Sequence, residues 1–151
     1  MGRSCAAVAV IVAVALASCS VDVERSSPAG CSVEQVQAAC LAEVGFVHVD
    51  GLIVEDVDRS RGIDSLTQFT LTGPSQNVDE ALRRADFSGA FDQMSATGLQ
   101  VDASADGGDL IGVAKDRWVS VDGQEIHRQV ARFAVVGQPG VEILKVVAFD
   151  T

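Results

Sequence analysis

Tyrosine is absent from this chain of 151 residues, tryptophan occurs once and phenylalanine six times. Sites that bind quaternary amines or single-stranded nucleic acids by stacking use clustered aromatic side chains, so this scarcity argues against them. Positive charge is also scarce, because 11 lysines and arginines face 21 aspartates and glutamates and leave a net charge of −10. Nucleic acids and anionic lipid headgroups attract basic surfaces, so we expect neither as an electrostatic partner. Hydrophobic residues still make up 48% of the chain, which is enough to bury a core.

Familiar catalytic signatures are missing as well. The chain contains no Gly-x-Ser-x-Gly, Ser-x-x-Lys or His-Glu-x-x-His motif. Its two histidines, His48 and His127, each fall on an expected strand, and we interpret them as exposed or packing side chains. The many carboxylates give no specific signal for a glycosidase-like pair. We therefore predict no catalytic residue and no cofactor, and the alternative is a small envelope hydrolase that uses carboxylates or His127.

The N-terminal segment has the pattern of a secretory signal peptide. Arg3 is the only charged residue before Asp22, and an unbroken apolar run of 13 residues extends from Cys5 to Ala17. As a helix, this run is about 20 Å long, which is shorter than the ~30 Å hydrocarbon core of a bilayer. A basic start, a short apolar middle and small residues at the end predict a cleaved signal over residues 1–18.

The end of that segment, Leu16-Ala17-Ser18-Cys19, resembles the lipobox of bacterial lipoproteins. The resemblance implies that Cys19 is acylated through its thiol and that the preceding residues are removed. Several acyl chains anchor a protein stably, because each buried CH₂ contributes about 0.8 kcal/mol. The expected location is therefore the outer face of the cell membrane, with residues 19–30 as lipidated cysteine and flexible tether and residues 31–151 as one globular domain.

Cys31 and Cys40 remain once the signal and the lipidated residue are set aside, and an exported protein meets an oxidising compartment, so we expect a disulfide. The segment Ser32-Val33-Glu34-Gln35 is typical of a capping box, and a helix starting at Val33 would separate the two cysteines by about 12–13 Å. A disulfide needs Cα atoms within about 7 Å. Either the helix starts nearer Gln35, which we favour, or these cysteines do not pair with each other.

The rest of the chain alternates helical and strand patterns. The expected strands cover residues 46–57, with a bend at Asp50-Gly51, then 64–72, 117–121, 125–136 and 141–149, and residues 58–62 are an expected turn. The first two strands form a hairpin and the last three a meander, whose near-continuous apolar last strand indicates a central position. Asp122-Gly123 is typical of a two-residue hairpin turn. With two helices on one face, this order predicts an α+β fold with an antiparallel sheet of about five strands.

The two expected helices cover residues 35–44 and residues from Asn77 to about 85. Asn77 is the expected N-cap of the second helix, and Val78, Ala81, Leu82 and Ala85 form its expected buried face. Ion pairs at a spacing of four residues are expected between Asp79 and Arg83 and between Glu80 and Arg84.

Two sets of residues partly match the patterns of metal sites. Residues 102–109, from Asp102 to Asp109, match the opening of an EF-hand calcium loop, but position 12 of that loop is Val113 instead of a bidentate carboxylate. An acidic solvated loop is the alternative, and the question of calcium stays open. Zinc binding by the two remaining cysteines with His48 and His127 matches no zinc spacing, so no metal is expected.

The overall layout is similar to small lipoproteins of high-GC Gram-positive bacteria whose function is not established. We expect a non-enzymatic binding or protein-interaction domain on a lipid anchor. Two variants stay open. One is an acidic inhibitor or immunity-type domain that binds a basic partner, whose association its charge would accelerate. The other is a carrier with an apolar pocket between helices and sheet.

Overall fold

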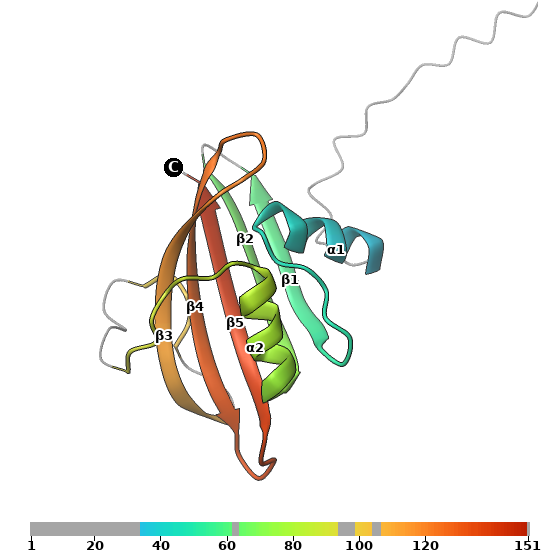
Figure 1. The fold of residues 1–151 in the computed structure, drawn as a ribbon, viewed down its shortest axis with the longest axis vertical. Coiled ribbons are helices and arrows are strands. Elements are labelled where there is room, and N and C mark those ends of the chain that lie inside the picture. Colours follow the sequence, from blue (N-terminus) through green and yellow to red (C-terminus); the bar gives the residue numbers. More distant parts are fainter. Residues whose placement is uncertain (1–33, 62–63, 94–98, 104–106, 151) are drawn as a thin grey trace, which may run out of the picture.

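The chain forms one five-stranded antiparallel sheet and two helices. The computed structural model describes residues 34–61, 64–93, 99–103 and 107–150. Its elements are α1 (Glu34–Glu43), β1 (Ile53–Arg61), β2 (Ser65–Pro74), α2 (Ser75–Arg84), β3 (Gly108–Val119), β4 (Glu125–Val135) and β5 (Val141–Asp150). The strand order is β1-β2-β5-β4-β3 (Figure 1), so the predicted α+β class, hairpin and meander are confirmed.

The central place of β5 follows from its sequence. This strand pairs with β2 on one side and with β4 on the other, and it carries the near-continuous apolar run that predicted such a position. Leu144, Val146 and Ala148 are each at most 1% exposed on one face, and Val147 on the opposite face is 7% exposed. A strand covered on both faces buries both sets of alternating side chains, which explains why its residues do not alternate in polarity.

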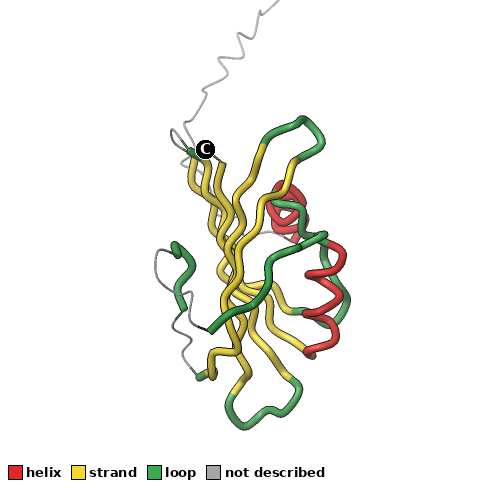
Figure 2. Tube along the Cα trace, turned by 60° about the vertical axis from the view of Figure 1, so that its left-hand side comes forward, coloured by secondary structure: helices red, strands yellow, loops and turns green. Residues whose placement is uncertain are grey.

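Both helices cover the same face of the sheet (Figure 2). The main core lies between them and the sheet, and it combines the helix residues Leu41, Val78, Ala81 and Leu82 and the adjoining Val44 with side chains of β2, β4 and β5. A smaller apolar cluster lies on the opposite face, where Val101 packs against Val113, Phe133 and Val147. The predicted buried face of α2, including Ala85, is confirmed, since its four residues are at most 8% exposed.

A buried arginine at the middle of β4 connects the helices to the sheet. Arg128 is 0% exposed and bonds Asp116 on β3 through two atoms, with Nε–Oδ1 at 2.8 Å and Nη2–Oδ2 at 2.5 Å. Its remaining N–H groups donate to carbonyl oxygens of Val44 and Ala85 from Nη1 and of Asp86 from Nη2. All five guanidinium N–H groups therefore have acceptors, which is the condition under which a charge tolerates burial.

Those carbonyls are available because both helices end in tight reversals. After α1, Phe46 N–H donates to the carbonyl of Leu41 and Gly45 N–H to that of Ala42, with Gly45 at a φ of +80°. This bonding pattern is that of a Schellman motif, which favours glycine at the left-handed position. A Cβ on Gly45 would lie 2.7 Å from Cε2 of Trp118 and 3.0 Å from Nη1 of Arg128. The end of α1 is therefore pressed against β3 and β4.

The first hairpin differs from its expected boundaries. Residues 46–52 are not a strand, because Gly51 at a φ of +83° reverses the chain and β1 begins at Ile53. The predicted turn over residues 58–62 was wrong, because Asp58–Arg61 continue β1 and pair with β2. A bulge between Glu55 and Asp58 changes the phase of the strand, and the positive φ of Asp56 lies within it.

The boundary and polar contacts of α2 also differ. The helix begins at Ser75 after Pro74, and Asn77 is not its cap but donates from Nδ2 to the carbonyl of Asp50 at 2.9 Å. The expected Glu80–Arg84 pair is confirmed at 2.6 Å. The expected pair between Asp79 and Arg83 was wrong, because Asp79 bonds Arg132 of β4 at 2.8 Å. Asp79 therefore pairs with a mostly buried arginine of the sheet instead of the arginine one turn away on its own helix.

The turn between β3 and β4 is longer than predicted. Gly123 has the expected positive φ, +87°, but its N–H donates to the carbonyl of Ser120, and Ser120 N–H donates to that of Gln124. Three residues, Val121–Gly123, therefore bridge the strands instead of two. The strand β3 is also longer than expected and begins at Gly108, inside the segment assigned to an acidic loop.

The first stability prediction concerns the buried ion pair. Arg128→Met leaves the 3% exposed carboxylate of Asp116 without its cation, and breaking a buried pair from one side typically costs about 3–5 kcal/mol. We expect a loss of that size in urea unfolding followed by Trp118 fluorescence. Arg117→Met removes an exposed ion pair with Glu125 and is expected to cost less than about 1 kcal/mol. Equal losses in the two variants would contradict the structural role of Arg128.

The second prediction compares two glycines with nearly the same positive φ, +80° at Gly45 and +87° at Gly123. Gly45→Ala combines left-handed strain of about 1–2 kcal/mol with overpacking of about 1–3 kcal/mol against Trp118. Gly123→Ala has the strain alone, because a Cβ there meets nothing within 4 Å. Thermal and urea unfolding are expected to show a clearly larger loss at Gly45. Indistinguishable losses would mean that the fit of Gly45 against Trp118 contributes nothing.

Candidate functional site

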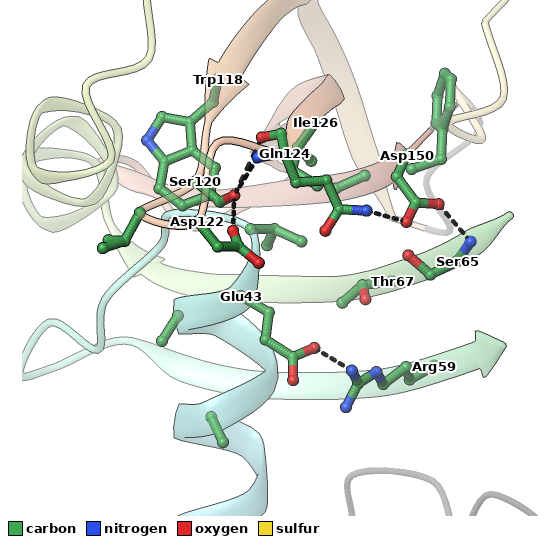
Figure 3. A pocket seen from close by; sticks show the side chains of 16 residues that line it. Glu43, Arg59, Ser65, Thr67, Trp118, Ser120, Asp122, Gln124, Ile126 and Asp150 are labelled. Carbon is green, nitrogen blue, oxygen red and sulfur yellow. Dashed lines mark hydrogen bonds and ion pairs between the residues drawn. The ribbon is translucent and has the colours of Figure 1, made fainter.

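A pocket of about 780 Å³ opens on the helix face, between the C-terminal half of α1, the β3–β4 hairpin and the ends of β2 and β5 (Figure 3). Volumes of this order are typical of small-molecule sites. The apolar part of its lining includes Ala39, Ala42, Val44, Trp118, Ile126 and Ala148. The polar part includes Glu43, Arg59, Thr67, Asp122, Gln124 and Asp150. The pocket therefore combines an apolar surface with charged groups from separate segments.

One wall is formed by an ion pair between α1 and β1. Arg59 Nη2 lies 2.6 Å from Oε2 of Glu43, and Arg61 approaches the other oxygen of that carboxylate at 4.0 Å. Nε of Arg59 is buried and, within the described residues, has no hydrogen-bond acceptor. Such a donor is uncommon in folded proteins and costs about 1–3 kcal/mol. Because this Nε atom is buried, it does not face the open pocket, and Arg59 forms part of the wall through its ion pair with Glu43.

Two carboxylates on the other walls are held in their charged form. Asp150 accepts the backbone N–H of Ser65 at 2.5 Å and the side-chain amide of Gln124, and the bond from Ser65 lowers the pKa of Asp150 below its ordinary value. The hydroxyl of Ser120 donates to Asp122 and likewise lowers the pKa of that carboxyl. A general acid needs a raised carboxyl pKa, so these groups fit charge recognition better than proton transfer.

Neither histidine lies in this pocket. The ring of His127 stacks on Phe149 with centroids 5.5 Å apart, and its Nε2 lies 3.4 Å from Glu125. His48 lines a separate hollow of about 460 Å³ with Gln37, Ala38, Leu41 and Val54. The hydroxyl of Ser120 is occupied by the Asp122 carboxylate and by Gln124. The geometry does not bring a histidine to a pocket hydroxyl, so the hydrolase alternative gains no assembled nucleophile and base.

The described residues of the segment that partly matches a calcium loop have other structural roles. Asp102 pairs with Lys145 at 3.5 Å, Asp109 lies on β3 opposite Ala134, and Val113 is buried in the smaller cluster. Ser104 and Asp106 lie outside the described residues. Within the described ranges, no group of three or more potential metal-ligating side chains occurs.

The predictions of a lipid anchor and of a disulfide concern mostly residues that the structure does not describe. Cys40 is on α1, is 1% exposed and is disulfide-bonded. Cys19 and Cys31 lie outside the described residues, as do residues 1–18 and the expected tether. Acylation of Cys19 and the pairing of Cys31 with Cys40 therefore stay predictions. None of the described helices has the length and apolar character needed to cross a membrane.

An apolar pocket between helices and sheet was one of the variants left open from the sequence, but its lining residues were not predicted, and Arg59 was placed in a turn. Trp118 is only half-buried and lines the pocket beside Arg128, whose guanidinium carbon lies 5.7 Å from its ring. The alternation in β4 could have indicated the buried arginine beside the pocket, because it places Arg128 in phase with the apolar Ile126 and Val130. Comparisons with known protein families, with curated proteins and with solved structures found no match to this chain.

Proposed function

We propose that this chain is a lipid-anchored lipoprotein of the outer face of the cell membrane whose globular domain is a non-enzymatic binding module. The observation that carries the binding role is the pocket of about 780 Å³ between α1 and the β3–β4 hairpin. It has the size and the mixed apolar and polar lining of small-molecule sites. Of the two variants considered from the sequence, this geometry supports a ligand-binding domain better than one that only presents an acidic surface.

The electrostatics of the pocket supports binding over catalysis. The carboxylates of Asp122 and Asp150 are stabilised as anions, and Glu43 is engaged by Arg59. Asp122 and Asp150, whose pKa values are lowered by their hydrogen bonds, therefore offer fixed negative charges instead of an exchangeable proton. The lipid anchor is supported by the lipobox-like residues ending at Cys19, and the tether would hold the pocket outside the membrane.

The anchor is tested by Cys19→Ala. Without the acceptor thiol, we expect the protein to move from the membrane fraction to the soluble or secreted fraction in cell fractionation. Ser20→Ala, which changes the neighbouring residue and leaves the thiol, is expected to stay with the membrane. Retention of Cys19→Ala in the membrane fraction would contradict the lipoprotein assignment. It would indicate instead that the apolar N-terminal segment stays attached as an uncleaved anchor.

The binding role is tested by filling the pocket. Ala39 and Ala38 are exposed neighbours on α1, but Ala39 lines the large pocket and Ala38 the separate hollow. We expect native mass spectrometry of the full chain in mild detergent to detect a co-purified small molecule in the unsubstituted protein and in Ala38→Phe, and its loss in Ala39→Phe. Unchanged adducts in Ala39→Phe, with unchanged thermal stability, would place binding elsewhere.

A further inference from the structure

The distribution of charge in the large pocket indicates which kind of ligand it accepts. Glu43 is already neutralised by Arg59 and approached by Arg61. Asp122 and Asp150 differ, because no basic side chain among the described residues forms an ion pair with either of them. Their contacts are hydrogen bonds from neutral donors, namely the hydroxyl of Ser120, the amide of Gln124 and the backbone of Ser65. Two negative charges in the lining therefore lack a counter-charge.

The basic side chains of the described residues do not supply that counter-charge. Among the described residues, every arginine takes part in an ion pair with a carboxylate, and these are Arg59, Arg61, Arg83, Arg84, Arg117, Arg128 and Arg132. Lys145 pairs with Asp102, and Lys115, an exposed residue of β3, is not among the residues that line the pocket. A cation that approaches Asp122 and Asp150 therefore comes from outside the described part of the chain, and it meets no repulsion from an uncompensated basic group in the lining.

Much of the remaining lining of the pocket is apolar. It includes Ala42 of α1, Val44 directly after that helix and Trp118 of the hairpin, and the exposed Val121 adds apolar surface. An apolar surface of this kind buries the hydrocarbon part of a ligand, while the two carboxylates orient the polar end of that ligand. An anionic ligand would face two carboxylates with only the already paired Arg59 to attract it.

We infer that the large pocket binds an organic cation in which a primary amine is attached to an apolar, preferably aromatic, body. The ammonium group lies toward Asp122 and Asp150, and the body packs against Trp118 and the end of α1. This inference rests on the proposed binding function and deepens it by naming the chemical class of the ligand. The same group is presented by a free amine or by a lysine side chain of a protein, and the test separates these sources.

The test uses three probes that share one body and differ in charge: phenethylamine, phenethyl alcohol and 3-phenylpropionate. Each is titrated into the full chain in non-ionic detergent, and binding is followed by the fluorescence of Trp118, the single tryptophan. We expect the amine to bind about tenfold more tightly than the alcohol and the carboxylate to bind most weakly, since each exposed ion pair contributes a factor of about 1.4 to 5. A lysine-containing tripeptide blocked at both ends is the protein-like arm, and tighter binding of the free amine assigns the small-molecule source.

Substitutions decide whether the two carboxylates cause the preference. Asp122→Asn and Asp150→Asn keep a hydrogen-bond acceptor and remove the charge, and each is expected to weaken the amine about threefold with little effect on the alcohol. Glu55→Gln removes an exposed carboxylate of β1 outside the pocket and is expected to change nothing. Equal affinities for the three probes, abolished by Ala39→Phe, would overturn the cation inference and keep the binding function. Absence of binding by every probe would overturn both.

Discussion

The bidentate bond between Arg128 and Asp116 is the constraint on which the arrangement of helices and sheet depends. It joins β4 to β3, and the same guanidinium donates hydrogen bonds to backbone carbonyl oxygens at the C-terminal ends of both helices. A guanidinium at the C-terminal end of a helix is also favoured by the helix dipole. Three aromatic rings, Phe46, Phe87 and Trp118, lie within 6 Å of its carbon and exclude water from it. Two helices are thus fixed by one buried side chain.

The pocket is a consequence of this arrangement. Because Gly45 lacks a side chain, α1 ends directly against Trp118, and Val44 offers its carbonyl to Arg128 while its side chain remains in the core. The helix therefore touches the sheet firmly at its C-terminal end. Farther along the sheet, the ion pair from Glu43 to Arg59 closes the side toward β1 and leaves a hollow in front of the hairpin (Figure 3). The same contacts that anchor α1 define the walls of the pocket.

The class of fold and the order of strands within each hairpin could be predicted, because alternation and apolar runs report burial locally. The buried ion pair could not, because it depends on register. A two-residue turn at Asp122-Gly123 would place Gln129 opposite Asp116, whereas the observed three-residue bridge places Arg128 there. One added residue in a turn changes every cross-strand partner and decides whether a charged side chain meets its counter-charge or water. The bulge at Asp56 has the same effect in β1.

The candidate site could not be predicted from local sequence patterns for a related reason. Its charged groups Glu43, Arg59, Asp122 and Asp150 come from four separate segments, and each sequence neighbourhood is that of an ordinary surface charge. The net charge of −10 predicts that some carboxylates lack a basic partner, but it does not say which. The fold determines which carboxylates lack a basic partner, because it pairs the described arginines with residues such as Glu80, Asp116 and Glu142. Two of the carboxylates that remain line the pocket, so the charge imbalance of the whole chain becomes a specific property of one site.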